Sequence, residues 1–242
     1  MDNFSSRLER VHEAIAQAAH KAARNPADIE LIAVSKTQTV AAIQEALRAG
    51  ITQLGENKVQ EARGKIEEIG RGVWHLIGHL QSNKAKDAVR LFDSIDSVDR
   101  LDLAQEIDHR AEALGKTQNV LLQVNIAGES TKFGCEPGAA RALAEKMNDL
   151  PRLALRGLMA IAPFSPDPEK SRPHFAGLRK LRDQLEADTG LHLPVLSMGM
   201  SGDFAVAIEE GATDVRVGTA LFGERLTLKQ RRPEDPSFLE ST

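Results

Sequence analysis

The stretch Glu30-Leu-Ile-Ala-Val-Ser35 sets the pattern by which the rest of the chain is interpreted. It is a short, continuous apolar run, which is typical of a parallel strand buried on both faces. Further apolar, strand-like runs follow it at intervals along the chain. They begin near Ile51, Val73, Asp93, Val120, Leu155, Val195 and Asp214.

Segments with helical periodicity lie between most of these runs. Their apolar residues recur at spacings of three and four, the stripe of an amphipathic helix. The predicted helices cover residues 40–49, 58–69, 82–91, 100–114, 137–150, 168–189 and 203–210. Several of them are followed directly by a glycine, the residue that most often ends a helix in the left-handed conformation. These glycines are Gly50, Gly70, Gly115, Gly190 and Gly211.

Alternating strands and helices predict an α/β protein with a parallel sheet covered by helices. Eight strand–helix units in about 200 residues match a single closed (β/α)8 TIM barrel near its lower size limit. An open, doubly wound sheet is the competing architecture. An extra amphipathic helix at 4–24 precedes the first strand, so the predicted domain covers 1–225. Residues 226–242 show no clear period and are predicted to form a flexible tail.

The composition excludes several classes of protein. The chain has 31 Lys and Arg residues and 35 Asp and Glu residues, so its net charge is −4. It therefore lacks the excess of basic residues that is typical of a nucleic-acid-binding protein. Cys135 is the only cysteine, so we expect no internal disulfide and no cysteine-based metal site, and an inert thiol. No apolar run approaches the ~18 residues of a membrane span, and the N-terminus lacks a signal core. We therefore expect a cytoplasmic protein that binds neither nucleic acid nor membrane.

Lys36 is the sharpest single feature of the sequence, because it ends the first predicted strand. Side chains alternate along a strand, so Lys36 shares a face with Ile32 and Val34. If that face points into the barrel, the amine lies in a pocket where its pKa falls and it becomes a nucleophile for aldehydes. The alternative is a lysine that simply reaches for solvent at the end of a strand.

Arg216 occupies the corresponding position in the last strand, Asp214-Val-Arg-Val-Gly218. Alternation directs Val215 and Val217 toward the helices and Arg216 inward. The eighth strand of a closed barrel pairs with the first, so Lys36 and Arg216 are expected to share one pocket. Two inward cations favour an anionic guest. The alternative is an internal ion pair of Arg216, for which Glu56 and Asp96 are the candidate carboxylates.

Two glycine-bearing turns follow the last two strands. Ser197-Met-Gly-Met-Ser-Gly-Asp203 and Arg216-Val-Gly-Thr219 each precede a short predicted helix, where exposed backbone N–H groups favour a phosphate. Either turn alone is equally consistent with a plain helix cap. Together with Lys36 and Arg216 they indicate a phosphorylated aldehyde, for which pyridoxal 5′-phosphate (PLP) is the prime candidate. An aldolase with a lysine nucleophile is an alternative, although such lysines usually lie later in the barrel.

The remaining candidate ligands have simpler interpretations. His75 and His79 are four residues apart around a strand and turn, without a third ligand nearby, so we expect packing or loop hydrogen bonds and no metal site. Met159, Met198 and Met200 are core residues by default and otherwise could line a pocket.

The chain resembles the pyridoxal phosphate homeostasis protein family, which is related to the N-terminal barrel of alanine racemase. The resemblance spans nearly the whole chain and is carried by seven stretches. They are Leu31-Ile-Ala-Val-Ser-Lys36, Gly55-Glu-Asn-Lys-Val-Gln-Glu61, Trp74-His-Leu-Ile-Gly-His-Leu-Gln-Ser-Asn-Lys84, Glu129-Ser-Thr-Lys-Phe-Gly134, Arg156-Gly-Leu-Met159, Ser197-Met-Gly-Met-Ser201 and Val215-Arg-Val-Gly-Thr-Ala-Leu-Phe-Gly223.

The resemblance implies a fold-type III barrel that holds PLP as an internal aldimine on Lys36. It also implies Arg216 against the pyridine nitrogen and Asn57 near the ring. The implied phosphate contacts are Met200, Ser201, Gly218 and Thr219. Two departures from the family pattern are Leu54, where Phe is usual, and Gly202-Asp-Phe204, where Asp-Asp-Met is usual.

The sequence also bears on catalysis. In alanine racemase, whose N-terminal barrel the chain resembles, racemisation by the two-base route uses a lysine and a tyrosine on opposite faces of the cofactor ring. This chain has no tyrosine. The resemblance thus implies a monomeric PLP carrier or regulator without catalytic residues. Its expected partners are PLP, free amino acids and PLP-requiring apo-enzymes. The alternative is a slow or specialised PLP enzyme that uses Lys36 as its sole base.

Overall fold

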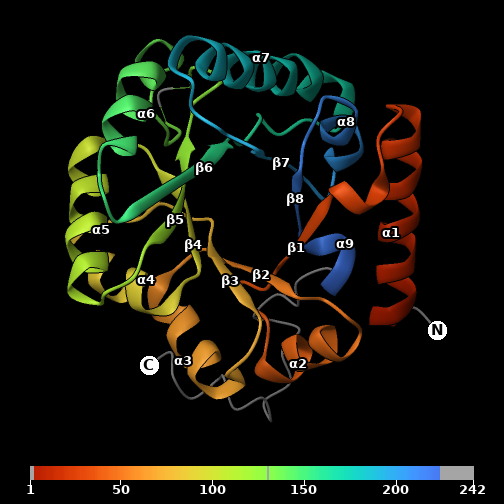
Figure 1. The fold of residues 1–242 in the computed structure, drawn as a ribbon. Helices are drawn as coiled ribbons and strands as arrows, with labels where there is room; N and C mark the ends of the chain where they lie inside the picture. Colours follow the sequence, from red (N-terminus) through yellow and green to blue (C-terminus); the bar gives the residue numbers. More distant parts are fainter. Residues whose placement is uncertain (1–2, 130, 224–242) are drawn as a thin grey trace.

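Eight parallel strands form a closed barrel in the computed structural model, which describes residues 3–129 and 131–223 (Figure 1). Each strand pairs with its neighbours in chain order, and β1 also pairs with β8. The predicted (β/α)8 barrel is therefore confirmed and the open sheet is excluded. The strands are β1 (Glu30–Val34), β2 (Gln53–Glu56), β3 (Val73–Leu76), β4 (Ser94–Val98), β5 (Gln118–Gln123), β6 (Leu153–Met159), β7 (Val195–Met200) and β8 (Asp214–Val217).

Helices surround the barrel in every segment for which the sequence predicts one. They are α1 (Phe4–Lys21), α2 (Val40–Arg48), α3 (Val59–Ile69), α4 (Ala85–Leu91), α5 (Leu101–Ala113), α6 (Ala140–Asn148), α7 (Arg172–Thr189), α8 (Phe204–Glu209) and α9 (Thr219–Phe222). Three of the predicted helices begin with a turn of 3-10 helix instead of α-helix, at Ser82–Lys84, Pro137–Ala139 and Pro168–Ser171. The five glycines predicted to end helices all have a positive φ.

The predicted end of the first helix is wrong by three residues. α1 stops at Lys21, and Ala23 adopts a left-handed φ of 53°. The chain then enters a 3-10 turn at Pro26–Asp28 that the side chain of Asn25 caps. Because the residue before a proline disfavours the α conformation, the helix has to end before Asn25. The predicted tail, 226–242, lies outside the described residues.

Side chains of β1 and β8 alternate between two environments, as the sequence predicts. Leu31 and Ala33 of β1 are buried in the layer between the sheet and the helices, as are Val215 and Val217 of β8. Arg216 faces the interior of the barrel and pairs in register with Ile32. Alternation in β8 thus places the charged Arg216 inside the barrel and its two valine neighbours against the helices.

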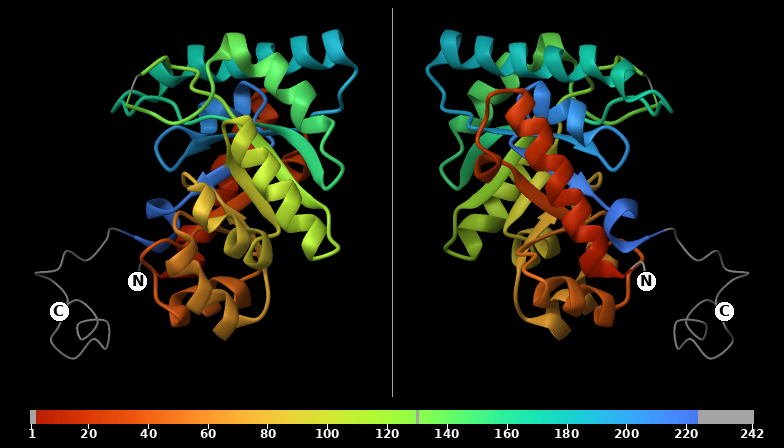
Figure 2. Two further views of the ribbon diagram at one scale, coloured as in Figure 1. Left: turned by 90° about the vertical axis from the view of Figure 1, so that its left-hand side faces the viewer. Right: turned by 90° about the vertical axis from the view of Figure 1, so that its right-hand side faces the viewer.

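The extra helix α1 covers the outside of the barrel where β8 meets β1. It packs against the short helices α8 and α9 and lies beside them in Figure 1 and in the right-hand view of Figure 2. Its apolar stripe is buried, and the ring of Phe4 lies 5.4 Å from that of Phe222. Each such buried side chain contributes roughly 1.5–3 kcal/mol. α1 therefore stabilises the part of the barrel that carries both glycine-bearing turns.

Candidate functional site

A cavity of about 360 Å³ opens at the carboxyl end of the barrel, between the ends of β1, β7 and β8. An adjoining cavity of about 280 Å³ shares part of its wall with the first. Six of the seven predicted site residues line the first cavity: Lys36, Met200, Ser201, Arg216, Gly218 and Thr219. The seventh, Asn57, lines the second, together with Lys36, Met200 and Arg216. The structure therefore brings all seven to one end of the barrel.

Lys36 lies in the turn directly after β1 and is only partly exposed. It lines both cavities, as does Val34 two residues earlier. The side chain thus follows the inward face of the strand, as the alternation along β1 predicts. Its position places an amine at the junction of the two cavities.

Arg216 is almost completely buried, with 3% of its surface exposed. Its guanidinium donates hydrogen bonds to the Ser197 hydroxyl (2.6 Å) and to the carbonyl of Ala160 (2.8 Å). Burial lowers the pKa of Arg216 from its ordinary value, and the negative charges of Asp96 and Asp214 act in the opposite direction. Both hydrogen-bond acceptors are neutral, so they do not neutralise the guanidinium, and its positive charge can interact with a ligand in the cavity.

The alternative ion pair of Arg216 is not formed within the described part of the chain. Glu56 lies on the helix-facing side of β2 and contacts Lys65 of α3 at 2.7 Å. Asp96 contacts His75 at 3.0 Å. Strand alternation explains why Glu56 pairs with Lys65 and not with Arg216, because a residue that follows the inward-facing Gly55 has to point outward.

The two glycine-bearing turns meet at Ser201. Its hydroxyl accepts the amide N–H groups of Gly218 (3.2 Å) and Ala220 (3.4 Å), which ties the turn after β7 to the turn after β8. Among the described residues, nothing accepts the N–H groups of Ser201, Gly202 and Thr219. Amide donors on small residues at the wall of a cavity that also holds two cationic side chains fit a phosphate ester.

Three aromatic side chains that were not among the predicted site residues also line the two cavities. The rings of His79 and Phe133 stack with centroids 3.7 Å apart and form part of the second cavity. This confirms the packing role expected for His79. Phe164, which is 90% exposed, lines the first cavity. Phe133 belongs to one of the quoted motifs, whereas an isolated aromatic in the loop after β6 gives no sequence signal.

The methionines and the two departures from the family pattern divide between core and site. Met198 is buried between the sheet and the helices, whereas Met200 lines both cavities. Leu54 is fully buried on the helix side, away from the cavities. Gly202 is exposed, with open space around the position of a Cβ. The departures therefore leave the backbone donors of the cavity in place.

Cys135 is buried, and burial raises the pKa of its thiol to about 12. The thiol therefore stays protonated near neutral pH, in agreement with the inert role expected for it. Within residues 3–129 and 131–223, no cluster of His, Cys, Asp and Glu is arranged to hold a metal ion. In the same part of the chain, no helix has the length and apolarity of a membrane span.

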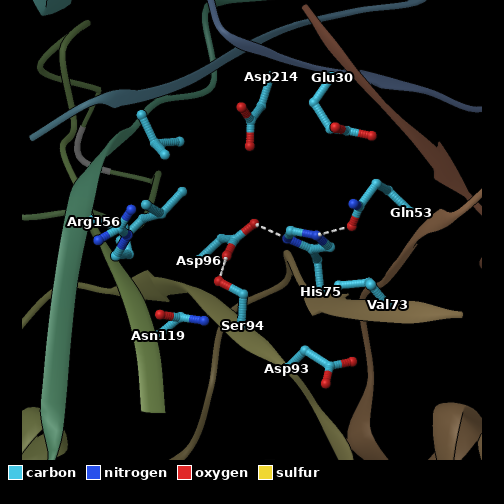
Figure 3. Close-up of a pocket in the computed structure, with 12 residues that line it drawn as sticks. Glu30, Gln53, Val73, His75, Asp93, Ser94, Asp96, Asn119, Arg156 and Asp214 are labelled. Atoms are coloured by element: carbon cyan, nitrogen blue, oxygen red, sulfur yellow. Dashed lines mark hydrogen bonds and ion pairs between the residues drawn. The ribbon is translucent and has the colours of Figure 1, made fainter. Parts of the chain in front are cut away.

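A third cavity, of about 300 Å³, lies at the opposite, amino-terminal end of the barrel (Figure 3). The imidazole of His75 lies there between Asp96 and Gln53, each at 3.0 Å. Burial acts to lower the pKa of His75, but the neighbouring Asp96 outweighs it and the pKa is raised. Burial raises the pKa of Asp214 to about 6. None of the seven site residues lines this cavity.

Asp214→Asn is expected to stabilise the fold by about 3 kcal/mol at pH 8 and by only about 1 kcal/mol at pH 4.5. The pKa of Asp214 is raised from 3.8 to about 6, so the folded protein binds this proton more tightly than the unfolded chain. Stability therefore falls as the pH rises from about 4 to about 6 and stays reduced above that window. Urea unfolding at the two pH values measures the difference. The exposed Asp183→Asn is the control, and an equal effect of Asp214→Asn at both pH values would contradict the argument.

Comparisons with known proteins all identify the same family. The family model described as "Alanine racemase, N-terminal domain" matches residues 7–226. The pyridoxal phosphate homeostasis protein of Aquifex aeolicus is 46% identical over 225 residues, which cover 92% of this chain and 99% of the relative. That of Pseudomonas aeruginosa is 46% identical over 227 residues, covering 93% and 97%.

Solved structures show the same similarity. PipY of Synechococcus elongatus, solved with PLP bound, superposes with a TM-score of 0.81 at 40% identity and covers 91% of this chain and 100% of its own. An alanine racemase of Clostridium difficile superposes with a TM-score of 0.74 at 16% identity, over 96% of this chain and 59% of its own. The second similarity concerns the fold alone.

Proposed function

Because the chain belongs to the alanine racemase N-terminal domain family, and within it to the pyridoxal phosphate homeostasis proteins, we propose that it binds PLP and acts in PLP homeostasis. The observation that carries the proposal is the convergence of Lys36, Arg216 and the two glycine-bearing turns on one cavity. A lysine amine, a buried cation and free amide donors match the aldehyde, the ring and the phosphate of this cofactor.

We assign the residues as follows. The Lys36 amine holds the aldehyde covalently, and Arg216 faces the pyridine nitrogen. The Ser201 hydroxyl and the backbone of Met200, Gly218 and Thr219 hold the phosphate, and Asn57 lies near the ring. When bound, PLP supplies an aldehyde that condenses with amines and a ring that withdraws electrons from them.

Arg216 also bears on whether the bound cofactor is catalytically strong. A guanidinium only donates hydrogen bonds and does not lose its proton in proteins, so it leaves a pyridine nitrogen unprotonated. The sequence contains no tyrosine to serve as a second acid or base. We therefore propose a carrier or regulator without efficient catalysis.

A slow PLP enzyme with Lys36 as its sole base is the second candidate. The cavity of about 280 Å³ that adjoins Lys36 favours it, because that cavity has room for a small ligand beside the cofactor. Free amino acids and PLP-requiring apo-enzymes stay predictions as partners of this protein. The monomeric state and the cytoplasmic location also stay predictions.

Deuterium exchange separates the two candidates. The PLP-loaded protein is incubated in D2O with free amino acids, and exchange at Cα is followed by NMR, with free PLP as the reference. For a carrier we expect exchange no faster than that with free PLP. Exchange well above free PLP that disappears in Lys36→Arg would instead establish the enzyme. Binding itself is read from the visible absorption that appears when PLP is added to the cofactor-free protein.

A further inference from the structure

A buried ionic cluster lies behind the turn that carries Lys36. Its centre is Lys65 of α3, whose side chain is 10% exposed. The Lys65 amine donates to the backbone carbonyl of Ser35 (2.9 Å), to Glu56 (2.7 Å) and to Glu61 (2.7 Å). All three of its N–H groups are therefore engaged, and one of them holds the peptide group that precedes Lys36.

Glu61 holds the peptide group on the other side. Its carboxylate Oε1, which contacts Lys65, also accepts the amide N–H of Thr37 at 2.5 Å. Thr37 has a φ of +65°, in the left-handed region that β-branched residues rarely adopt. Such a conformation persists only where surrounding contacts fix it, and Glu61 supplies a charge-assisted contact of this kind.

Glu56 anchors the cluster to the barrel. Its side chain is fully buried, and Oε1 also accepts the hydroxyl of Ser35 at 2.7 Å. Burial raises the pKa of Glu56, and Lys65 acts in the opposite direction. The three charged residues thus join β2 and α3 to the residues on both sides of Lys36.

We propose that Lys65 and Glu61 are positioning residues that fix the Lys36 turn, so that its amine is presented for covalent capture of the cofactor. The inference rests on the proposed function. Neither residue lines the two cavities at this end of the barrel. Their effect is therefore confined to the direction of Lys36, while the phosphate-binding turns after β7 and β8 keep their own contacts.

This separation gives the inference a selective readout. PLP requires both the phosphate-binding turns and the Lys36 amine. Pyridoxine 5′-phosphate has the same ring and phosphate but carries an alcohol in place of the aldehyde, so it uses the turns alone. The ratio of the two dissociation constants isolates the contribution of Lys36. General damage to the fold weakens the binding of both ligands and leaves the ratio of their dissociation constants unchanged.

Glu61→Ala is expected to weaken the affinity for PLP about tenfold, because one charge-assisted hydrogen bond to the turn is lost. The affinity for pyridoxine 5′-phosphate should change by less than about twofold. Glu61→Gln should restore most of the PLP affinity, since an amide oxygen still accepts the Thr37 N–H. Glu106→Ala is the matched control. Glu106 has the same exposure as Glu61, 31% against 30%, and forms the same i,i+4 pair at 2.7 Å, with Arg110 of α5. It should leave both affinities unchanged.

A second variant tests Lys65 itself. Lys65→Met leaves the carboxylate of Glu56 buried without its cation, so it is combined with Glu56→Gln to preserve the fold. The double variant should show the same selective loss of PLP affinity as Glu61→Ala. An unchanged ratio of dissociation constants in both variants would overturn the inference, even if both ligands bind more weakly. Equal affinity of the wild-type protein for the two ligands would instead overturn the covalent role that the proposed function assigns to Lys36, and the inference with it.

Discussion

Lys36→Ala is expected to abolish the retention of PLP through gel filtration and to weaken its binding by about 100-fold, equivalent to about 2.7 kcal/mol. The Lys36 amine lies at the junction of the two cavities, within the same wall as Arg216 and Ser201. Without it the aldehyde has no nucleophile there, and the phosphate contacts alone have to hold the cofactor. Absorbance titration with PLP measures the affinity. Lys36→Arg should lose covalent retention to the same extent, because a guanidinium keeps the charge but does not attack aldehydes.

The chain offers matched lysine controls for this experiment. Lys58 and Lys84 line a separate cavity of about 250 Å³ at the same end of the barrel. Lys58→Ala and Lys84→Ala remove the same charge near the site but leave the capture of the aldehyde intact. We expect both variants to retain PLP through gel filtration. Loss of retention in either of them, together with retention in Lys36→Ala, would move the covalent site away from Lys36.

Gly199→Ala is expected to lower the free energy of unfolding by about 3 kcal/mol. Gly199 lies in β7 with a φ of +90°, a conformation that residues with a Cβ rarely adopt. A Cβ built there would lie 2.5 Å from Cβ of Ala207 and 2.9 Å from Cα of Phe204, both in α8. The close approach of β7 and α8 places the turn that carries Ser201, so PLP binding should also weaken. Urea denaturation measures the change in stability.

Gly202→Ala is the control for this prediction, because it lies only three residues away. No atom lies within 4 Å of a Cβ built at Gly202. The substitution should therefore leave both the free energy of unfolding and PLP affinity nearly unchanged. A similar loss of stability in the two variants would show that the strain at Gly199 does not determine the geometry of the turn.

The barrel could be predicted because its determinants are local. The alternation at β1 and β8 places Lys36 and Arg216 on the interior face, and the structure confirms that these two residues share a cavity. The same alternation excludes Glu56 as a partner of Arg216, a consequence that the sequence interpretation did not draw. The early end of α1 depends on local chemistry as well, since Asn25 and Pro26 start a new turn.

Other parts of the site depend on contacts between segments far apart in the sequence, which no periodic pattern reports. The stack of His79 on Phe133 joins the loops after β3 and β5. The contacts of Lys65 with Ser35 and Glu56 join α3 to the strands β1 and β2. On a helix, a lysine such as Lys65 usually indicates a solvated surface, and its burial becomes visible only when the barrel is assembled.

Borohydride reduction of the PLP-loaded protein, followed by peptide mass spectrometry, tests the central assignment most directly. Reduction makes the bond between an amine and the aldehyde permanent, so the modified residue can be located. We predict one phosphopyridoxyl group per chain, on the peptide that contains Lys36, and none on that peptide in Lys36→Arg. Labelling spread over surface lysines, or concentrated at a lysine other than Lys36, would contradict the assignment of this cavity as the PLP site.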